Sequence, residues 1–546
     1  MKKRITSFFS RFQNADAAKT VIGIIFFILV IYPVVRMLLF IDAESLQNAI
    51  GHPSFIRGLS NSVIIATTAT LITIVIAYAL AWCLERVDMK GKGLFRVVLI
   101  LPMLIPSISH GMGLIVLFGN NGIITNFLNL TTSIYGRWGV ICGSIMYAFP
   151  VAFLMFADVL KYEDAAPYEA ASILGIPKHR QLASISMPFL RKPLISIAFS
   201  VFTMIITDYG VPLMVGGNDI TIPVIMYQEV IGQLNFPKGA VYGVVLLVPA
   251  LIAFVVDILN KDHANSRYDT RSFVLIQKPA TRAFAYTTCV VGSLLAVLPI
   301  FAFVCIGFAK KYPIDLSLTM ANIQKTLNMG AIDYLLNSVI IAIGVSIIGT
   351  AVSFITAYLT ARMKSQLSKF LHLISITSAA VPGIVLGLAY VIVFKGSFIY
   401  GTLVILIMVN VIHFIASPYL MMYNSMNKLN ENLEAVGETL GIGRLRMIMD
   451  VFIPQVRSTI IEMVSYFFVN SMMTISAVSF LVTTRNKPIA LMINQFEAQM
   501  QLECAAIVSL TILCVNLIIK GTLQIVAKRT SIRKYEVNQN DFQEAV

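Results

Sequence analysis

Charged side chains are scarce in this chain of 546 residues: they make up 12% of the total, whereas 57% of the residues are hydrophobic. Soluble domains carry roughly 25% charged and about 45–50% apolar residues. The shortage of charge excludes a soluble multidomain enzyme, and the high hydrophobicity excludes an intrinsically disordered chain. The class that remains is a polytopic membrane protein, whose spans need roughly 20 apolar residues each.

Motifs of several enzyme and redox classes are also missing. The six cysteines lie in or beside apolar runs and form no CxxC pair, so we interpret them as small core residues rather than metal ligands or disulfides. No GxxxxGK[ST] phosphate loop occurs, which excludes a Walker-type ATP site in this chain. No paired carboxylates, metal-spaced His/Cys cluster or nucleophile motif supports a membrane-embedded enzyme.

Twelve apolar runs are long enough to cross a bilayer. The first run is too long for the core of a signal peptide, so we expect it to stay as a membrane helix. The runs lie near residues 20–40, 59–83, 94–118, 138–160, 193–217, 239–258, 284–309, 335–360, 368–394, 401–424, 458–482 and 502–524.

The basic residues predict the orientation of these spans, because they gather in cytoplasmic loops. With a cytoplasmic N-terminus, the inside segments hold 31 of the 41 Lys and Arg residues, the outside loops hold 9, and Arg36 lies in the first span. Both termini are therefore expected in the cytoplasm. The net charge of +14 is explained by this topology, without nucleic acid as a partner.

The chain also contains an internal repeat. NSVIIA begins at Asn61 and again at Asn337, an offset of 276 residues, and an Ala-Tyr pair follows each copy, at Ala77-Tyr78 and at Ala357-Tyr358. IPSISHGMGLIVLF from Ile105 aligns with VPGIVLGLAYVIVF from Val381 in the same way. We predict an all-α membrane protein of about twelve transmembrane helices in two six-helix repeats. The domains are then a first membrane domain at 1–259, a cytoplasmic linker at 260–283 and a second membrane domain at 284–546.

Ion-coupled secondary transporters with parallel repeats share this general plan and remain an alternative. In that class the long cytoplasmic loop is the central one. Here the longest inside connections lie within each repeat, between its fourth and fifth helices.

Those two connections carry a second repeated motif. They read YEAASILGIPKHRQLASISMPFLRKPL and LEAVGETLGIGRLRMIMDVFIPQVRSTI, and Pro188 and Pro454 stand thirteen residues after Gly175 and Gly441. Each copy predicts a short helix, a turn that a glycine permits, a second helix with one apolar face, and a proline at the entry to the next span. An ordinary surface helix would explain a single copy, but duplication at matched positions favours a docking element.

The pattern Glu-Ala-Ala-x-x-x-Gly resembles the EAA loop of ATP-binding cassette importer permeases of the type I fold. In that family the loop forms a coupling helix that docks into the ATPase subunit. The resemblance implies this role for Glu169, Ala170, Ala171 and Gly175.

The second loop departs from the family pattern. Ala435 stands at the position of the glutamate, Glu434 lies one residue earlier, and Gly437 replaces an alanine. Together with Gly441 and Pro454, these residues form the corresponding candidate coupling loop.

The resemblance also implies the partners and the location. Two separate ATPase subunits would bind Mg-ATP, so this chain itself needs no cofactor, and an extracytoplasmic binding protein would deliver the solute. The chain is then a permease subunit of the bacterial cytoplasmic membrane rather than an enzyme. Stretches such as VSYFFVNSMMTISAVSFL are similar to the fused permeases for 2-aminoethylphosphonate, with ferric-iron permeases as the alternative.

Polar residues within the predicted spans are candidates for the translocation pathway, because such groups are costly in a bilayer. They include Asp208 with Tyr209, and Asn470 with Thr474. Asp208 could face the ammonium group of a zwitterion, or it could cap a helix break near Gly210. His110 and His413 are not at equivalent repeat positions, so no symmetric metal site is indicated.

Paired helix breaks are a second indication of the pathway. Pro106 and Gly111 interrupt the third predicted helix, and Pro382 and Gly387 interrupt its counterpart. Packing alone also explains proline and glycine in membrane helices, but the matched positions favour pore lining.

Overall fold

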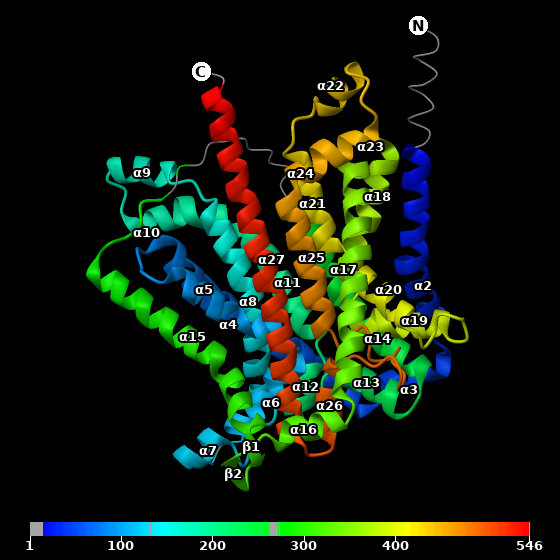
Figure 1. Cartoon of the computed structure of the whole chain (residues 1–546). Helices are drawn as coiled ribbons and strands as arrows, with labels where there is room; N and C mark the ends of the chain where they lie inside the picture. Colours follow the sequence, from blue (N-terminus) through cyan, green and yellow to red (C-terminus); the bar gives the residue numbers. More distant parts are fainter. Residues whose placement is uncertain (1–14, 132, 261–270, 272, 545–546) are drawn as a thin grey trace. The chain divides into compact units, whose positions relative to one another are not determined.

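A computed structural model describes residues 15–131, 133–260, 271 and 273–544 of the chain (Figure 1). Part of the predicted linker at 260–283, residues 261–270 and 272, lies outside the described residues. The helices group into two compact units. The first-repeat unit comprises residues 41–329 and 492–510, and the second-repeat unit comprises residues 1–40, 330–491 and 511–546.

In its described residues the first-repeat unit consists of helices, their connections and one short hairpin. Its elements are α3 (Ala43–Gly51), α4 (Pro53–Arg86), α5 (Lys92–Ile100), η2 (Leu101–Leu104), α6 (Ser107–Phe118), α7 (Ile123–Leu128), α8 (Arg137–Lys161), α9 (Ala166–Ile173), α10 (Lys178–Gln181), η3 (Leu182–Ser186), α11 (Met187–Ile206), α12 (Gly210–Val215), α13 (Ile222–Tyr227), η4 (Gln228–Gly232), α14 (Phe236–Asn260), α15 (Pro279–Gly307), β1 (Ala309–Lys311), β2 (Asp315–Leu318) and α16 (Ala321–Asn328). The two strands pair antiparallel.

The second-repeat unit is also built from helices. They are η1 (Phe27–Ile31), α2 (Tyr32–Leu38), α17 (Ala331–Ala361), α18 (Gln366–Thr377), η5 (Ser378–Ala380), α19 (Gly383–Phe394), α20 (Leu403–Phe414), α21 (Ala416–Asn427), α22 (Leu433–Thr439), α23 (Arg444–Met447), η6 (Ile448–Phe452), α24 (Ile453–Gln455) and α25 (Arg457–Met473). Helices α26 (Ala490–Ala498) and α27 (Leu502–Glu544) have residues in both units.

The internal repeat of the sequence is a repeat of structure. Helix α6 begins at Ser107 and ends at Phe118, and its counterpart α19 begins at Gly383 and ends at Phe394, an offset of 276 residues at both ends. The long helices α4 and α17 correspond as well, because each contains one copy of NSVIIA. The prediction of an all-α membrane protein built from two repeats is confirmed.

The described residues contain nine helices that are long and apolar enough to cross a membrane, or up to eleven if each of two bent pairs is one span. About twelve were predicted. A continuous span over 458–482 is wrong, because α25 ends at Met473 and the backbone turns extended at Thr474. The predicted third span is also broken, into α5, η2 and α6, because Pro102 and Pro106 cannot donate the amide hydrogen that a helix needs.

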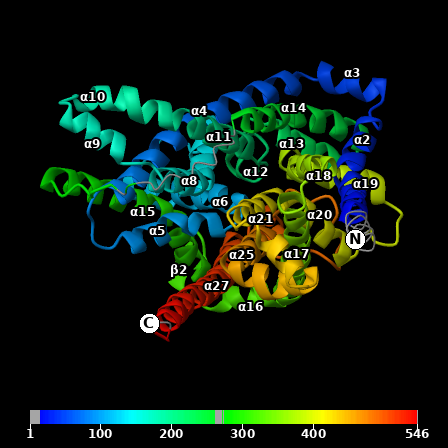
Figure 2. The same ribbon diagram turned by 90° about the horizontal axis from the view of Figure 1, so that it is seen from above.

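The first membrane helix, Ala15–Leu38, packs with the second repeat rather than with the repeat that follows it in sequence. The buried Lys19 donates from Nζ to the carbonyl of Met363 at 2.7 Å and to Ser365 Oγ at 2.9 Å. The hydroxyl of Tyr390, on α19, donates to the carbonyl of Leu29 at 2.8 Å, and α2 and α19 lie side by side (Figure 2).

Helix α15 also packs with the other repeat, in the opposite sense to the first membrane helix. It opens the second predicted domain in sequence but packs on α4, α5 and α6 of the first repeat. The compact units therefore do not coincide with the sequence domains at 1–259 and 284–546. The boundaries of those sequence domains remain a prediction.

Replacing Lys19 by methionine should weaken the attachment of the first helix, because three hydrogen bonds of a buried ammonium group are lost. We expect the free energy of unfolding to fall by about 1.5–3 kcal/mol, typical of hydrogen bonds to a charged group. Thermal unfolding in detergent, followed by size-exclusion chromatography, measures this. Thr20→Val is the matched control, since the Thr20 hydroxyl bonds only to the Asp16 carbonyl in its own helix. Equal midpoints for the two variants would contradict the attachment.

Candidate functional site

The two repeated loops have the same structure. In the first, α9 is followed by a turn, α10, the π-helical segment η3 and then α11. In the second, α22 is followed by a turn, α23, the π-helical segment η6 and then α24. Pro188 and Pro454 lie in the first turn of α11 and α24. The helix–turn–helix form predicted for both loops is confirmed.

Gly175 and Gly441 close α9 and α22 in the same way. Both have left-handed backbone, with φ of +67° and +70°. After each, the isoleucine N–H donates to the carbonyl five residues earlier, from Ile176 to Ala171 at 2.9 Å and from Ile442 to Gly437 at 2.8 Å. This is the Schellman motif that ends many helices. A Cβ at either glycine would meet nothing within 4 Å, so these positions need glycine for its backbone conformation alone.

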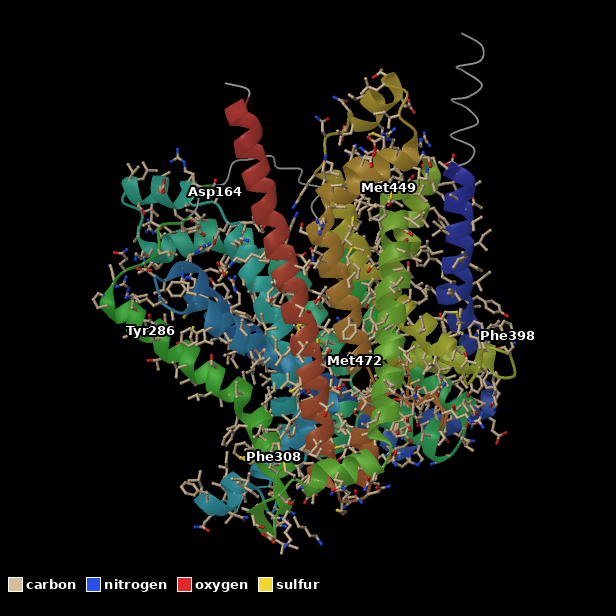
Figure 3. The ribbon with its side chains drawn as sticks, in the orientation of Figure 1. Asp164, Tyr286, Phe308, Phe398, Met449 and Met472 are labelled. Atoms are coloured by element: carbon tan, nitrogen blue, oxygen red, sulfur yellow. The ribbon has the colours of Figure 1, made fainter. Side chains whose placement is uncertain are left out.

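Large apolar side chains stand exposed on both loops. Ile173 is 86% exposed and Leu174 is 75% exposed at the end of α9. Leu440 and Leu445 are 69% and 76% exposed on either side of the second turn, and Met449 follows on η6 (Figure 3). Clustered exposed apolar residues beside polar ones are typical of a surface that binds another protein.

The residues that resemble the family motif divide between the two faces of α9. Glu169 and Ala170 are exposed, and Ala171 is buried. The Glu169 carboxylate lies 3.4 Å from Nη1 of the exposed Arg271. Tyr168, which precedes them, faces inward, and burial together with its hydrogen bond to Glu163 raises its pKa to about 12.

The second loop repeats this division and explains its departure from the motif. Ala435 is exposed and Gly437 is buried, where a Cβ would approach the sulfur of Met447 to 2.8 Å. Glu434 is half-buried, and its carboxylate faces inward, where it accepts hydrogen bonds from the Arg362 guanidinium. Glu434 therefore occupies the inward position that Tyr168 has in the first loop, and it does not replace Glu169.

The paired breaks of the third helix are present in both repeats. Pro106 precedes α6 and Pro382 precedes α19, each with an extended ψ, of 152° and 144°. In the second repeat the segments on either side of the break, Gln366–Ala380 and Gly383–Phe394, are bent by 105°.

The glycines beyond these breaks allow close packing. A Cβ at Gly111 would lie 2.6 Å from Cβ of Met214 on α12. At the equivalent Gly387, it would lie 2.6 Å from the carbonyl oxygen of Ala477. In each repeat the glycine lets the broken third helix touch the segment that follows the fifth helix, which is the short helix α12 in the first repeat and non-helical backbone in the second.

Asp208 and Tyr209 belong to that segment in the first repeat. The Asp208 carboxylate accepts from the backbone N–H of Val211 at 3.0 Å and of Gly210 at 3.3 Å, so it caps α12. The ring of Tyr209 is fully buried and stacks on Tyr227, with centroids 4.9 Å apart. Of the two roles the sequence left open for Asp208, the contacts favour the cap.

Asn470 and Thr474 lie at the corresponding place in the second repeat. The Asn470 amide donates to the carbonyl of Tyr466 at 2.8 Å, within its own helix. The N–H of Thr474 donates to the Asn470 carbonyl at 3.0 Å, where α25 ends. Asn470 and Thr474 are thus close to one another, whereas Asp208 belongs to the other unit.

The two histidines take part in local contacts. His110 Nδ1 lies 3.3 Å from the Pro106 carbonyl, and its ring faces Tyr147 edge-on. The ring of His413 packs on Phe414. Within the part of the chain that the structure describes, no three His, Cys, Asp or Glu residues are grouped so as to hold a metal ion.

The repeated Asn-Ser dipeptide has a role that the sequence did not reveal. Ser62 Oγ accepts from the N–H of Ile222 at 2.9 Å, and Ser338 Oγ accepts from the N–H of Ile489 at 2.8 Å. The amides of the neighbouring Asn61 and Asn337 donate to carbonyls of the same segments. The recurrence of NSVIIA was the signal, but only the fold identifies the segments that the dipeptide holds.

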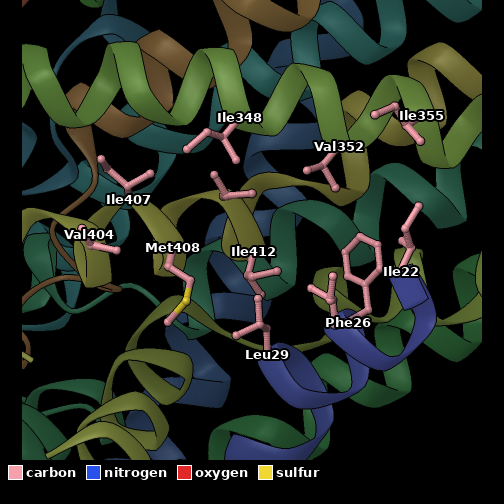
Figure 4. Close-up of a pocket in the computed structure, with 12 residues that line it drawn as sticks. Ile22, Phe26, Leu29, Ile348, Val352, Ile355, Val404, Ile407, Met408 and Ile412 are labelled. Atoms are coloured by element: carbon pink, nitrogen blue, oxygen red, sulfur yellow. The ribbon is translucent and has the colours of Figure 1, made fainter. Parts of the chain in front are cut away.

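Two grooves in the structure are apolar. One, of about 370 Å³, lies in the second-repeat unit between the first membrane helix, α17 and α20 (Figure 4). The other, of about 250 Å³, lies in the first-repeat unit between α15, α4, α6 and α8. Residues at equivalent repeat positions, such as Ile76 and Val352, line both. Such linings suit hydrocarbon rather than a charged solute.

Comparison with known proteins identifies related sequences. The sequence profile of a family described as "Binding-protein-dependent transport system inner membrane component" matches residues 73–262 and again residues 349–532. The "Ferric transport system permease protein FbpB" of Actinobacillus pleuropneumoniae is 24% identical over 516 residues, which cover 87% of this chain and 74% of that protein. The "Putative ferric transport system permease protein FbpB 1" of Haemophilus influenzae is 23% identical, over 84% of this chain and 77% of that protein.

A shorter relative matches part of the chain. The "Molybdenum transport system permease protein ModB" of Azotobacter vinelandii is 29% identical over 157 residues, or 28% of this chain and 70% of that protein. These names do not confirm the predicted specificity for 2-aminoethylphosphonate. The ferric-iron alternative is the better supported of the two.

Adding one methyl group at Gly111 or Gly387 should disturb the contact between the third helix and the segment beside it. We expect Gly387→Ala to be more damaging, because the Cβ meets backbone rather than a side chain, and overpacking of this kind costs about 1–3 kcal/mol. Thermal stability in detergent and uptake in cells measure the effect. Gly23→Ala, in the first membrane helix with nothing within 4 Å, is the control and should be silent. A silent Gly387→Ala would show that the close approach is unimportant.

Proposed function

The chain belongs to the family of binding-protein-dependent transport system inner membrane components, and from this we propose that it is the permease of an ATP-driven importer for ferric iron. The family match covers both repeats, so both membrane domains of the importer are on one polypeptide. The chain is a membrane subunit whose relatives are transport permeases. The family description and the multiple apolar helices support a multi-pass protein of the inner membrane.

The pair of equivalent loops carries the mechanistic part of the proposal. Each loop is closed by a left-handed glycine and exposes several leucine or isoleucine side chains. Two loops of this shape suit two copies of one partner, and in this proposal each loop docks into one ATPase subunit. Glu169 and Ala170 of the first loop, and Ala435 of the second, lie on the exposed faces that would meet the ATPase.

The direction of transport follows from the predicted topology. The loops belong to segments rich in Lys and Arg, which predicts a cytoplasmic position for the loops and for both termini. ATP binding in the partner subunits draws the loops together, and a binding protein on the opposite face delivers the solute. Catalysis of hydrolysis is assigned to the partners, which hold Mg-ATP.

The choice of ferric iron rests on the two relatives named for ferric transport, which align with most of this chain. The second candidate is 2-aminoethylphosphonate, which rests on the resemblance of VSYFFVNSMMTISAVSFL and similar stretches to permeases for that solute. An ion-coupled transporter is the candidate of another class, and it would work without an ATPase.

Uptake separates these candidates. The chain is expressed with its ATPase and binding protein in cells that lack their own uptake systems, and radiolabelled ferric iron is compared with radiolabelled 2-aminoethylphosphonate. We expect iron uptake that requires both partner proteins. Uptake of the phosphonate but not of iron would replace the solute, and uptake without the ATPase would contradict an ATP-driven importer.

The glycine turn provides a test of coupling. Valine at Gly441 must adopt a left-handed backbone, which costs about 1–2 kcal/mol and should displace the loop from the ATPase. We expect Gly441→Val to abolish both uptake and the stimulation of ATP hydrolysis by loaded binding protein. Gly443→Val is the matched control two residues away, because Gly443 has a φ of −66° and open space around it. Wild-type coupling in Gly441→Val would argue against docking at this loop.

A further inference from the structure

Two arginines stand at equivalent positions beneath the two loops. Arg86 ends α4, and Arg362 follows the last residue of α17, again at an offset of 276 residues. Their side chains are 9% and 4% exposed. A buried guanidinium is costly unless every donor finds a partner, so the partners of these two residues define what each arginine holds together.

Arg362 holds the second loop directly. Its Nε donates to Oε1 of Glu434 at 2.7 Å, and Nη2 donates to Oε2, so the pair is bidentate. Nη2 also donates to the carbonyl of Asn430 at 2.7 Å, just before the loop. The guanidinium carbon lies 5.4 Å from the ring centroid of Phe452, at the end of η6. One side chain thus connects the end of α17 to α22 and to both margins of the loop.

Arg86 holds the first loop through intermediates. Its Nη2 donates to Oε2 of Glu163, and Oε1 of the same carboxylate accepts from the hydroxyl of Tyr168 on α9. The Tyr168 oxygen also lies 2.7 Å from Oγ of Ser186 on η3. The ring of Phe273 covers the guanidinium at 3.7 Å. Again the end of a long membrane helix is connected to both helices of the loop.

The other ion pairs of the second loop differ in their exposure. Lys364 and Glu431, only a few residues from Arg362 and Glu434, are 3.5 Å apart with side chains 74% and 73% exposed. Exposed pairs of this kind contribute little, because solvent screens them and long side chains must be ordered. Burial and bidentate geometry distinguish the Arg362 pair as a fixed connection.

We propose that Arg86 and Arg362 are positioning residues that make each loop move with the long membrane helix beneath it. The second loop is joined directly through Glu434, and the first through Glu163 and Tyr168. This inference rests on the proposed function, because it assigns the arginines a part in passing the ATPase motion from the loops to α4 and α17. It also explains why position 434 carries a carboxylate although the equivalent position 168 carries a phenol.

Two conservative variants break the connections without emptying the sites. Tyr168→Phe removes one hydroxyl and leaves the Arg86–Glu163 pair intact, and Glu434→Gln keeps the shape of the side chain but removes its charge. The matched controls are Tyr162→Phe and Glu431→Gln, since Tyr162 and Glu431 are exposed neighbours of the two test positions.

The experiment uses the complete transporter, with this chain, its ATPase subunits and its binding protein, in proteoliposomes. Radiolabelled ferric iron taken up per ATP hydrolysed is measured for each variant, together with the KM for ATP. We expect both test variants to lower the ratio by roughly tenfold, consistent with the loss of a charge-assisted hydrogen bond. The KM for ATP should stay unchanged because the nucleotide binds to another subunit. Both controls should match the wild type.

Wild-type ratios in both test variants, with ATPase subunits still bound, would overturn the inference and leave the proposed function standing. If Glu434→Gln does not yield folded protein, Tyr168→Phe decides alone. Copurification of ATPase subunits with the wild-type chain is measured first. If the ATPase subunits do not copurify with the wild-type chain, the proposed function is overturned, and the inference with it.

Discussion

A chain that crosses a membrane can leave the helical conformation only where its backbone donors and acceptors find other partners. This protein leaves it in both repeats, before α6 and α19 and again after α11 and α25. The structure depends on how those stretches are satisfied. Asp208 supplies acceptors for the first turn of α12, and Ser62 and Ser338 supply an acceptor for the residue that follows each irregular segment.

Close packing completes the same arrangement. Gly111 lets the broken third helix approach α12, and Gly387 lets its counterpart approach the backbone at Ala477, so closely that a methyl group would not fit. Ser62 on α4 and Ser338 on α17 hold the segment of their own repeat by hydrogen bonds. The glycine of the third helix packs against the same segment. The breaks are therefore parts of a packed structure and not gaps in a helix.

Much of this was accessible from the sequence, because it depends on local rules. The breaks at Pro106 and Pro382 follow from the missing amide hydrogen of proline, and the turn at Gly441 follows from the backbone freedom of glycine. The repeat was visible as well, since NSVIIA recurs at a constant offset. Each of these features is decided by residues that are neighbours in the chain.

What the sequence could not settle depends on residues far apart in the chain. In the sequence, Glu434 stands one residue before the position of the motif glutamate. Only the structure shows that its partner is Arg362, 72 positions away. The span over 458–482 looked continuous because its composition is apolar, whereas the segment beyond Met473 is held by side chains of α17 such as Ser338. Hydropathy measures the cost of leaving water, and it does not report which distant side chain will stabilise a break.

The attachment of the first membrane helix has a consequence for how the protein is made. The hydrogen bond from Lys19 to Met363 joins residues 344 positions apart. During synthesis the first helix enters the bilayer long before its neighbours in the second repeat are made, so it must remain there without these contacts. Its mean hydropathy of 2.6 makes the helix stable in lipid before these contacts form. Assembly of the second-repeat unit is then a late step, in which a helix embedded at the start of translation is joined by a segment that emerges 344 residues later.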